Sequence, residues 1–177
     1  LLKSGIRGKL CCCMTEPRKI VVMGVSGCGK STFGQALAAA LGVAFSDGDD
    51  LHTAENIAKM AAGQPLDDED RAPWLTRVGA QLADEAGRVV ACSALKRAYR
   101  DTIRSHAPEV VFVHLHGARA LLQARMTTRP GHFMPARLLD SQLATLELPA
   151  VDERAIRVDI ALPPEAQLAE VLAALGL

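Results

Sequence analysis

The sequence predicts an α/β fold, in which a parallel β-sheet is flanked by helices. From Ile20 onward, short apolar runs rich in β-branched residues alternate with longer amphipathic stretches, which is typical of consecutive βαβ units. The short runs are largely apolar, as expected for strands buried on both faces of a sheet. With 177 residues, of which 49% are hydrophobic and 23% charged, the chain has the size and composition of one globular domain.

The element boundaries follow from these runs and from the glycines and prolines between them. The expected strands are 19–24, 43–46, 89–93, 110–115 and 156–160. The expected helices are 31–41, 53–62, 74–85, 96–105, 118–127, 136–147 and 165–175. Gly42 and Gly87 follow the first and third helices, Pro73 precedes the third, and Pro163 and Pro164 open the last. No internal repeat or linker is found, so residues 14–177 are predicted to form a single domain.

Charge and composition argue against several classes of protein. The 20 basic and 20 acidic residues give a formal charge of zero, which does not suit a protein that neutralises a nucleic-acid backbone. Aromatic residues, at 3%, offer few surfaces on which bases could stack. Apolar stretches such as 36–41 are too short to cross a bilayer. We therefore expect a soluble protein that binds neither nucleic acid nor membrane.

The cysteines and the first residues bear on the cellular compartment and on the start of the domain. Three adjacent cysteines at 11–13, with Cys28 and Cys92 apart, form neither a disulfide framework nor a zinc-binding spacing. A cytoplasmic location is expected. Residues 1–13 lack the long apolar centre of a signal peptide, so we expect a disordered upstream or non-native extension with Met14 as the natural start.

Residues 24–31, Gly-Val-Ser-Gly-Cys-Gly-Lys-Ser, have the spacing of a phosphate-binding loop. The motif leaves an apolar run and enters an amphipathic stretch, as a loop between a strand and a helix must. The glycines let successive backbone amides face phosphates, Lys30 can reach the terminal phosphates, and the Ser31 hydroxyl can bind Mg²⁺. A glycine-rich turn without a ligand is the alternative. The motif predicts a nucleoside triphosphate site and leaves the reaction open.

An acidic segment, Asp47-Gly48-Asp49-Asp50, follows the second expected strand. It should therefore lie at the carboxyl edge of the sheet beside the phosphate loop, where ligands of open α/β sheets bind. One carboxylate there could hold Mg²⁺ through water, and another could accept a proton from an attacking hydroxyl. A solvated acidic turn that caps the next helix is the alternative interpretation.

Four arginines surround residues 130–135, Pro-Gly-His-Phe-Met-Pro. They are Arg119, Arg125, Arg129 and Arg137. As a group they predict a mobile lid that closes over phosphates and supplies positive charge. A solvated helix face is the alternative for any one of them.

Further short sequence motifs lie between residues 20 and 153, and we call them blocks. They are 47–49 with Leu51 and His52; Asn56, Ile57, Lys59, Met60, Gly63, Pro65, Leu66, Asp70, Arg71 and 73–75; 92–96 with 99–101; 132–134; and Ser141, Gln142, Leu146, Glu147 and Pro149. With these blocks and the phosphate loop, the chain resembles the gluconate kinases, small P-loop sugar-acid kinases related to shikimate and nucleoside monophosphate kinases. Thr53 and Leu143 depart from the family pattern, and neither touches the phosphate chemistry.

The resemblance implies a reaction and an architecture. The reaction is Mg²⁺-dependent transfer of the γ-phosphoryl group of ATP to the 6-hydroxyl of D-gluconate, which gives 6-phosphogluconate and ADP. The architecture has three layers, with a five-stranded parallel sheet in the order 2-3-1-4-5 between helices, and a mobile lid. The family commonly forms homodimers, to which Trp74 or the helix 136–147 could contribute an interface.

The resemblance also implies roles for individual residues. The expected ATP-binding residues are Gly24, Ser26, Gly27, Cys28, Gly29, Lys30, Ser31 and Thr32, and the expected Mg²⁺ ligands are Ser31 and Asp47. The expected catalytic residues are Lys30, Asp49, Arg125 and Arg129. The expected substrate-binding residues are Asp49, His52, Arg71, Lys96 and Arg100. Arg71 is favoured for the carboxylate because a guanidinium binds it bidentately, although pairing with Asp67, Asp68 or Asp70 is a rival role.

Two other functions share part of this pattern. A kinase of shikimate or of a nucleoside monophosphate would use the same phosphate-binding residues, but the blocks at 47–75 and 92–96 favour gluconate. A GTP-binding switch needs an Asn-Lys-x-Asp motif to read guanine, which this sequence lacks. Its Asp-x-x-Gly at 84–87 precedes a strand, whereas the switch motif follows one.

Overall fold

The computed structural model describes residues 18–84, 86–127 and 136–177. The strands are β1 (Lys19–Met23), β2 (Ala44–Asp47), β3 (Arg88–Ala91), β4 (Val111–His116) and β5 (Ala155–Asp159). The helices are α1 (Lys30–Leu41), the 3-10 helix η1 (Gly48–Leu51), α2 (Ala54–Ala61), α3 (Asp68–Leu82), α4 (Arg97–His106), α5 (Arg119–Thr127), α6 (Ala136–Thr145) and α7 (Pro164–Ala174). The predicted extension and Met14 lie outside the described residues, as do Arg129 and residues 130–135 of the predicted lid.

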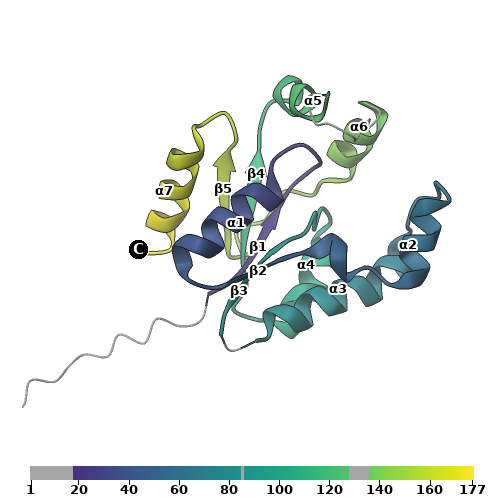
Figure 1. The fold of residues 1–177 in the computed structure, drawn as a ribbon, viewed down its shortest axis with the longest axis horizontal. Helices are drawn as coiled ribbons and strands as arrows, with labels where there is room; N and C mark the ends of the chain where they lie inside the picture. The colour runs from purple at the N-terminus through teal and green to yellow at the C-terminus, as the bar shows by residue number, and fades with distance from the viewer. Residues whose placement is uncertain (1–17, 85, 128–135) are drawn as a thin grey trace, which may run out of the picture.

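The strands form one parallel sheet in the order β2-β3-β1-β4-β5 (Figure 1). Strand β1 is central, and its Val21 is in register with Val90 of β3 and Phe112 of β4. The predicted strand order is therefore confirmed. Because all strands run the same way, the loops that follow them meet at one edge of the sheet, and α5 and α6 lie beyond that edge (Figure 1).

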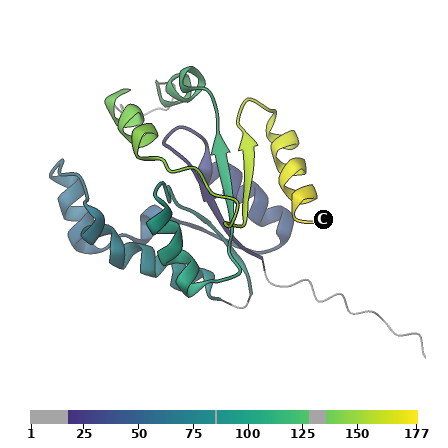
Figure 2. The ribbon, with the colours of Figure 1, turned by 180° about the vertical axis from the view of Figure 1, so that it is seen from behind.

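Helices cover both faces of the sheet and form the predicted three layers. Along β1, Ile20 and Val22 pack into one apolar cluster, and Val21 and Met23 pack into a second. Successive residues of a strand point to opposite faces, so β1, which is fully buried from Ile20 to Met23, contributes to both. Residues of α1, α5, α6 and α7 complete the first cluster, and residues of α3 and α4 complete the second. Figures 1 and 2 show α1 and α3 on opposite sides of the sheet.

Helix α3 begins six residues earlier than predicted. The Asp67 side chain accepts from the backbone amide of Asp70, and the Asp70 side chain accepts from the amide of Asp67, so the two aspartates form a reciprocal capping box. This cap starts the helix at Asp68 and places Pro73 inside it. The prediction that Pro73 precedes the helix is wrong, because the local acidic cap outweighs the proline signal.

Trp74, suggested for a dimer interface, is instead part of the core. Its side chain is only 2% exposed, and its indole nitrogen donates to the carbonyl oxygen of Gly48 at 2.6 Å. The 3-10 helix that contains Gly48 was not predicted either; Asp47 caps it through a side-chain bond to the amide of Asp49. Among the described residues, no helix has the length and apolar character needed to span a bilayer.

Candidate active site

The phosphate loop connects β1 to α1 and has the backbone shape that its glycines predict. Gly24 has a φ of 141°, and a Cβ there would lie 2.6 Å from the carbonyl oxygen of Leu115. Gly27 has a φ of 82°, and a Cβ there would lie 2.7 Å from Cγ of Met126. Side chains at either position would clash as well as strain the backbone. These two glycines thus have a local structural reason, and the loop ends at the amino terminus of α1, where amides and helix dipole favour an anion.

Lys30, Ser31 and Asp47 lie together at this helix start. The Lys30 ammonium donates to the carbonyl oxygen of Val25 at 3.1 Å, which holds it over the loop. The Ser31 hydroxyl donates to a carboxylate oxygen of Asp47 at 2.7 Å, and the other oxygen of Asp47 accepts from the amide of Asp49 at 3.1 Å. A hydroxyl and a carboxylate are hard oxygen ligands, and Mg²⁺ commonly takes only one or two such groups beside phosphates and water. These residues fit a Mg²⁺-nucleotide.

Three more of the predicted ATP-binding residues lie in this loop or just after it: Ser26, Cys28 and Thr32. The Ser26 amide donates to the side-chain oxygen of Gln142 at 2.7 Å, so α6 contacts the loop directly. Cys28 is 1% exposed, and burial raises the pKa of its thiol, which favours a packing role over a reactive thiolate. Thr32 is exposed on the first turn of α1. Gln142 was quoted in the sequence pattern without a role.

Asp49 and His52 lie after β2, in η1 and directly after it. The His52 ring stacks on Trp74 with centroids 4.4 Å apart and an interplanar angle of 15°. Burial lowers the pKa of His52 and outweighs the opposing effect of Asp49; the positive charge of Arg71 lowers it further. His52 is therefore a neutral hydrogen-bonding group at pH 7. Asp49 is exposed at the start of η1, beside the Ser31–Asp47 pair.

A cavity of about 820 Å³ opens between the start of α3, the end of β3 and α6. Its lining residues are Pro65, Leu66, Asp67, Asp68, Glu69, Arg71, Ser93, Leu95, Lys96, Tyr99, Leu138, Ser141, Gln142 and Thr145. Gln142 belongs both to this lining and to the contact with Ser26, so the cavity adjoins the phosphate loop. Its walls carry two cations, three carboxylates and several hydroxyl groups, which suits a small, hydroxyl-rich ligand.

The structure does not show Arg71 in the alternative role, an ion pair with a neighbouring aspartate of residues 67–70. Asp70 pairs with Lys59, and Asp68 pairs with Lys96. Within the described part of the chain, the Arg71 guanidinium forms no ion pair; it donates to the carbonyl oxygen of Leu66 at 3.2 Å and lies 5.8 Å from the centroid of the Tyr99 ring. Much of its donor fork therefore faces the cavity without a carboxylate partner.

Lys96 also lines the cavity, but its ammonium is already engaged. Its Nζ lies 2.8 and 2.7 Å from the two carboxylate oxygens of Asp68. The Tyr99 hydroxyl donates to the same carboxylate at 2.5 Å. The bonds from Lys96 and Tyr99 hold the pKa of Asp68 below its usual value. Asp68 and Tyr99 had no predicted role, although residues 99–101 formed one of the quoted blocks.

Of the five predicted substrate ligands, Arg71 and Lys96 line the cavity, whereas Asp49, His52 and Arg100 do not. Arg100 is the one of these that is fully buried. Its side chain is 0% exposed, and Nε and Nη2 donate to the two carboxylate oxygens of Glu153 at 2.6 and 3.0 Å. Its Nη1 donates to the carbonyl oxygens of Ala94 and Leu95. A buried guanidinium with these partners has no surface for gluconate, so the prediction for Arg100 is wrong.

The arginines around the predicted lid have different surroundings. Arg125 donates to the carbonyl oxygen of Ile160 at 2.8 Å, and its Nη1 lies 4.0 Å from where a Cβ on Gly29 would be. It therefore stands beside the phosphate loop. Arg119 instead forms an exposed ion pair with Asp140 of α6, as the solvated alternative expects. The structure describes only the backbone at residue 137.

Cys92 directly follows β3 and is buried. Burial raises the pKa of its thiol to about 12, and the charges of Lys30, Asp49 and Arg71 have smaller effects on that pKa. These three residues come from the phosphate loop, the turn after β2 and helix α3.

Comparison with known proteins agrees with this geometry. The shikimate kinase family model matches residues 26–174. A gluconokinase of Gluconobacter oxydans is 48% identical over 161 residues, which span 89% of this chain and 90% of that protein. The thermosensitive gluconokinase of Escherichia coli is 49% identical, over 79% of this chain and 78% of its own.

Structural similarity leads to the same family. The crystal structure of a gluconokinase from Sinorhizobium meliloti has a TM-score of 0.83 and 52% sequence identity, and the match covers 90% of this chain and 92% of that one. Both the sequence and the fold are therefore shared over nearly the full length. The chain belongs to the gluconokinase family of P-loop kinases.

Proposed function

We propose that this protein is a gluconokinase, which transfers the γ-phosphoryl group of ATP to the 6-hydroxyl of D-gluconate. The observation that carries the proposal is the cavity beside the phosphate loop, where the Arg71 fork has no carboxylate partner among the described residues. Gluconate is an anion with several hydroxyl groups; Arg71 offers its carboxylate a cation, and the hydroxyls, amide and carboxylates of the lining offer its hydroxyl groups polar partners. The identity of 48% with a gluconokinase supports the same substrate.

The phosphate loop and its neighbours would bind Mg²⁺-ATP. Loop amides and Lys30 would hold the β and γ phosphates, while Ser31 and Asp47 would hold the metal. Bound Mg²⁺ would neutralise phosphate charge. Arg125, beside Gly29, would add positive charge near the nucleotide. Arg129 is proposed for the same region from the family resemblance alone.

Asp49 is proposed as the base or orienting group for the acceptor. In the transfer, the 6-hydroxyl oxygen forms a bond to the γ-phosphorus and the bond between that phosphorus and the leaving ADP oxygen breaks. The hydroxyl proton passes to the Asp49 carboxylate. Most of the rate enhancement in such a transfer comes from positioning and charge stabilisation, which needs little covalent chemistry from the protein.

Gluconate recognition would rest on Arg71, Lys96 and His52. Arg71 would bind the gluconate carboxylate with two parallel N–H bonds. Lys96 would share its charge between Asp68 and the ligand, and the neutral His52 ring would bind a hydroxyl. A homodimer and a cytoplasmic location remain our predictions; since Trp74 is buried, the helix at 136–147 is the proposed contribution to a dimer.

An acceptor panel tests this function. ADP release is measured with Mg²⁺-ATP and D-gluconate, shikimate, glycerate, AMP or no acceptor, side by side. We expect strong stimulation by gluconate alone. Stimulation by shikimate or AMP instead would keep the phosphate site and reject the gluconate assignment of the cavity.

A further inference from the structure

The loop between β3 and α4 has an unusual backbone. Ala94 has a φ of 43°, and among the described residues it is the one non-glycine residue with positive φ. An L-residue adopts this left-handed conformation only where its surroundings hold it there. Ala94 is also fully buried. Its neighbours Ser93, Leu95 and Lys96 line the acceptor cavity, so this conformation shapes one wall of the cavity.

The Arg100 guanidinium binds the loop between β3 and α4. Nη1 donates to the carbonyl oxygen of Ala94 at 3.1 Å and to that of Leu95 at 3.2 Å. The remaining two donor atoms bind Glu153 at 2.6 and 3.0 Å, and both side chains are 0% exposed. We call this arrangement the Arg100–Glu153 clamp.

Glu153 is itself fixed to the segment that precedes β5. Its carboxylate accepts from the amide of Ala150 at 2.9 Å, and its own amide donates to the carbonyl oxygen of Ala150 at 3.0 Å. Burial raises the pKa of Glu153, but the bonds from Arg100 and Ala150 outweigh it and keep the pKa below its usual value. The Glu153 carboxylate is therefore ionised, and its hydrogen bonds connect Arg100 to the turn at residues 150–153.

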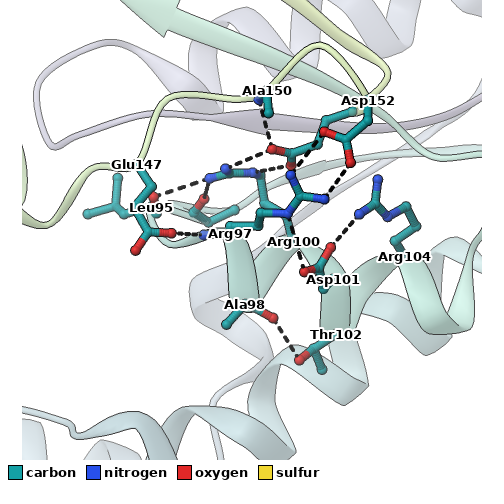
Figure 3. A network of polar contacts seen from close by, with 12 residues as sticks. Leu95, Arg97, Ala98, Arg100, Asp101, Thr102, Arg104, Glu147, Ala150 and Asp152 are labelled. Carbon is teal, nitrogen blue, oxygen red and sulfur yellow. Dashed lines mark hydrogen bonds and ion pairs between the residues drawn. The ribbon is translucent and has the colours of Figure 1, made fainter.

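Three further hydrogen bonds hold the same loop. The amide of Glu147 donates to the carbonyl oxygen of Leu95 at 2.9 Å, and the Glu147 carboxylate accepts from the amide of Arg97 at 2.6 Å (Figure 3). At the other end, the amide of Gly24 in the phosphate loop donates to the carbonyl oxygen of Ser93 at 3.3 Å. The loop is thus connected to the phosphate loop on one side and to the chain before β5 on the other.

A buried ion pair is a weak source of stability, because desolvation offsets much of its attraction. A well-packed apolar pair would serve the fold equally well. The specific property of this pair is that one planar cation binds a carboxylate and two consecutive loop carbonyls at once. That geometry fixes a conformation, which an apolar pair would not do.

We propose that Arg100 and Glu153 are positioning residues for the acceptor, which hold residues 93–96 in the shape that binds gluconate without touching it themselves. The proposal rests on the proposed function, because it takes the cavity to be the gluconate site. It replaces the ligand role predicted for Arg100. It also implies that the clamp acts on acceptor binding more than on ATP binding.

Kinetics of Glu153→Gln test the proposal, with Asp152→Asn as the matched control. Asp152 binds Arg97 of α4 at 2.9 and 2.5 Å, so it links the same two segments from the solvent side without reaching the loop carbonyls. For Glu153→Gln we expect the gluconate KM to rise about ten-fold, with less than about two-fold change in the ATP KM. Fluorescence of Trp74, the single tryptophan, should show the same weakening of gluconate binding without catalysis.

A gluconate KM within about two-fold of wild type, or equal rises in both KM values, would overturn the proposal. The same effect in Asp152→Asn would also overturn it. If Glu153→Gln does not fold, Arg100→Lys keeps a buried cation opposite Glu153 but cannot bind both carbonyls in the same plane; the same selective rise is then expected. Wild-type protein without gluconate activity would instead reject the proposed function, so the two failures are distinguishable.

Discussion

Replacing Arg71 with lysine tests acceptor recognition most directly. The substitution keeps a positive charge on α3 at the edge of the cavity but removes the planar fork. The Arg71 guanidinium donates one hydrogen bond to the carbonyl oxygen of Leu66 and otherwise faces the cavity. Replacing the guanidinium should therefore disturb the fold little. A lysine ammonium would bind a carboxylate as a point charge through one short bond.

The expected magnitude follows from the lost bond. A hydrogen bond between charged groups contributes about 1.5 to 3 kcal/mol. Since about 1.4 kcal/mol corresponds to a factor of ten, the gluconate KM of Arg71→Lys should rise by roughly 10 to 100-fold. The ATP KM should change by less than about two-fold, because the phosphate loop keeps all of its own contacts.

The assay is ADP release at saturating Mg²⁺-ATP with gluconate varied, and at saturating gluconate with ATP varied. Arg104→Lys is the matched control, because Arg104 is a surface arginine of α4 that pairs with Asp101 away from the cavity. An unchanged gluconate KM for Arg71→Lys would refute the role of the fork. A similar rise for Arg104→Lys would show that the effect is not local.

Three further predictions concern the phosphate site, the base and the buried histidine. Lys30→Ala should abolish turnover while the far-UV circular dichroism stays unchanged; near-normal activity would contradict its phosphate role. Asp49→Asn should lower kcat far more than ATP affinity, measured by titration with ATP, and an unchanged kcat would remove Asp49 from the mechanism. His114 is 1% exposed, and its Nδ1 has no hydrogen-bond partner in the part of the chain that the structure describes; burial, then His116, Arg157 and Arg100, lower its pKa to about 4. The unfolded chain takes up this proton near pH 6.5, so its contribution to stability is complete above that value and is lost as the pH falls towards 4. Between about pH 7 and pH 5, wild type should lose about 2 kcal/mol more than His114→Gln in urea denaturation; parallel losses would contradict the assignment.

The fold was predictable because its signals are local and repeated. Apolar β-branched runs locate all five strands to within one or two residues of their observed ends. The error at α3 has a specific cause: Pro73 was taken as a start signal, whereas the side chains of Asp67 and Asp70 provide a stronger one three residues apart. The short η1 was missed because its stability comes from Asp47 and from the long-range bond between Trp74 and Gly48.

The candidate site was predictable where chemistry depends on adjacent residues, and less so where it depends on tertiary partners. Lys30, Ser31 and Asp47 lie together as their motifs predict. Arg71 and Arg100 are both arginines within family blocks, and nothing in the sequence distinguishes an arginine that faces a cavity from a buried one. The distinction depends on Glu153, which lies 53 positions away from Arg100.

The position of Asp49 links the two halves of the site. Asp47 binds Ser31 with one carboxylate oxygen and the amide of Asp49 with the other. Gly48, between them, lies so close to β3 that a Cβ would be 2.4 Å from the carbonyl oxygen of Ala91, and its own carbonyl accepts from Trp74. The backbone at Asp49, the residue proposed as the base, therefore cannot shift far without disturbing the residue proposed to hold Mg²⁺. These contacts would place the proposed proton acceptor relative to the phosphate loop before any substrate binds, which is how a site that works mainly by positioning gains its rate.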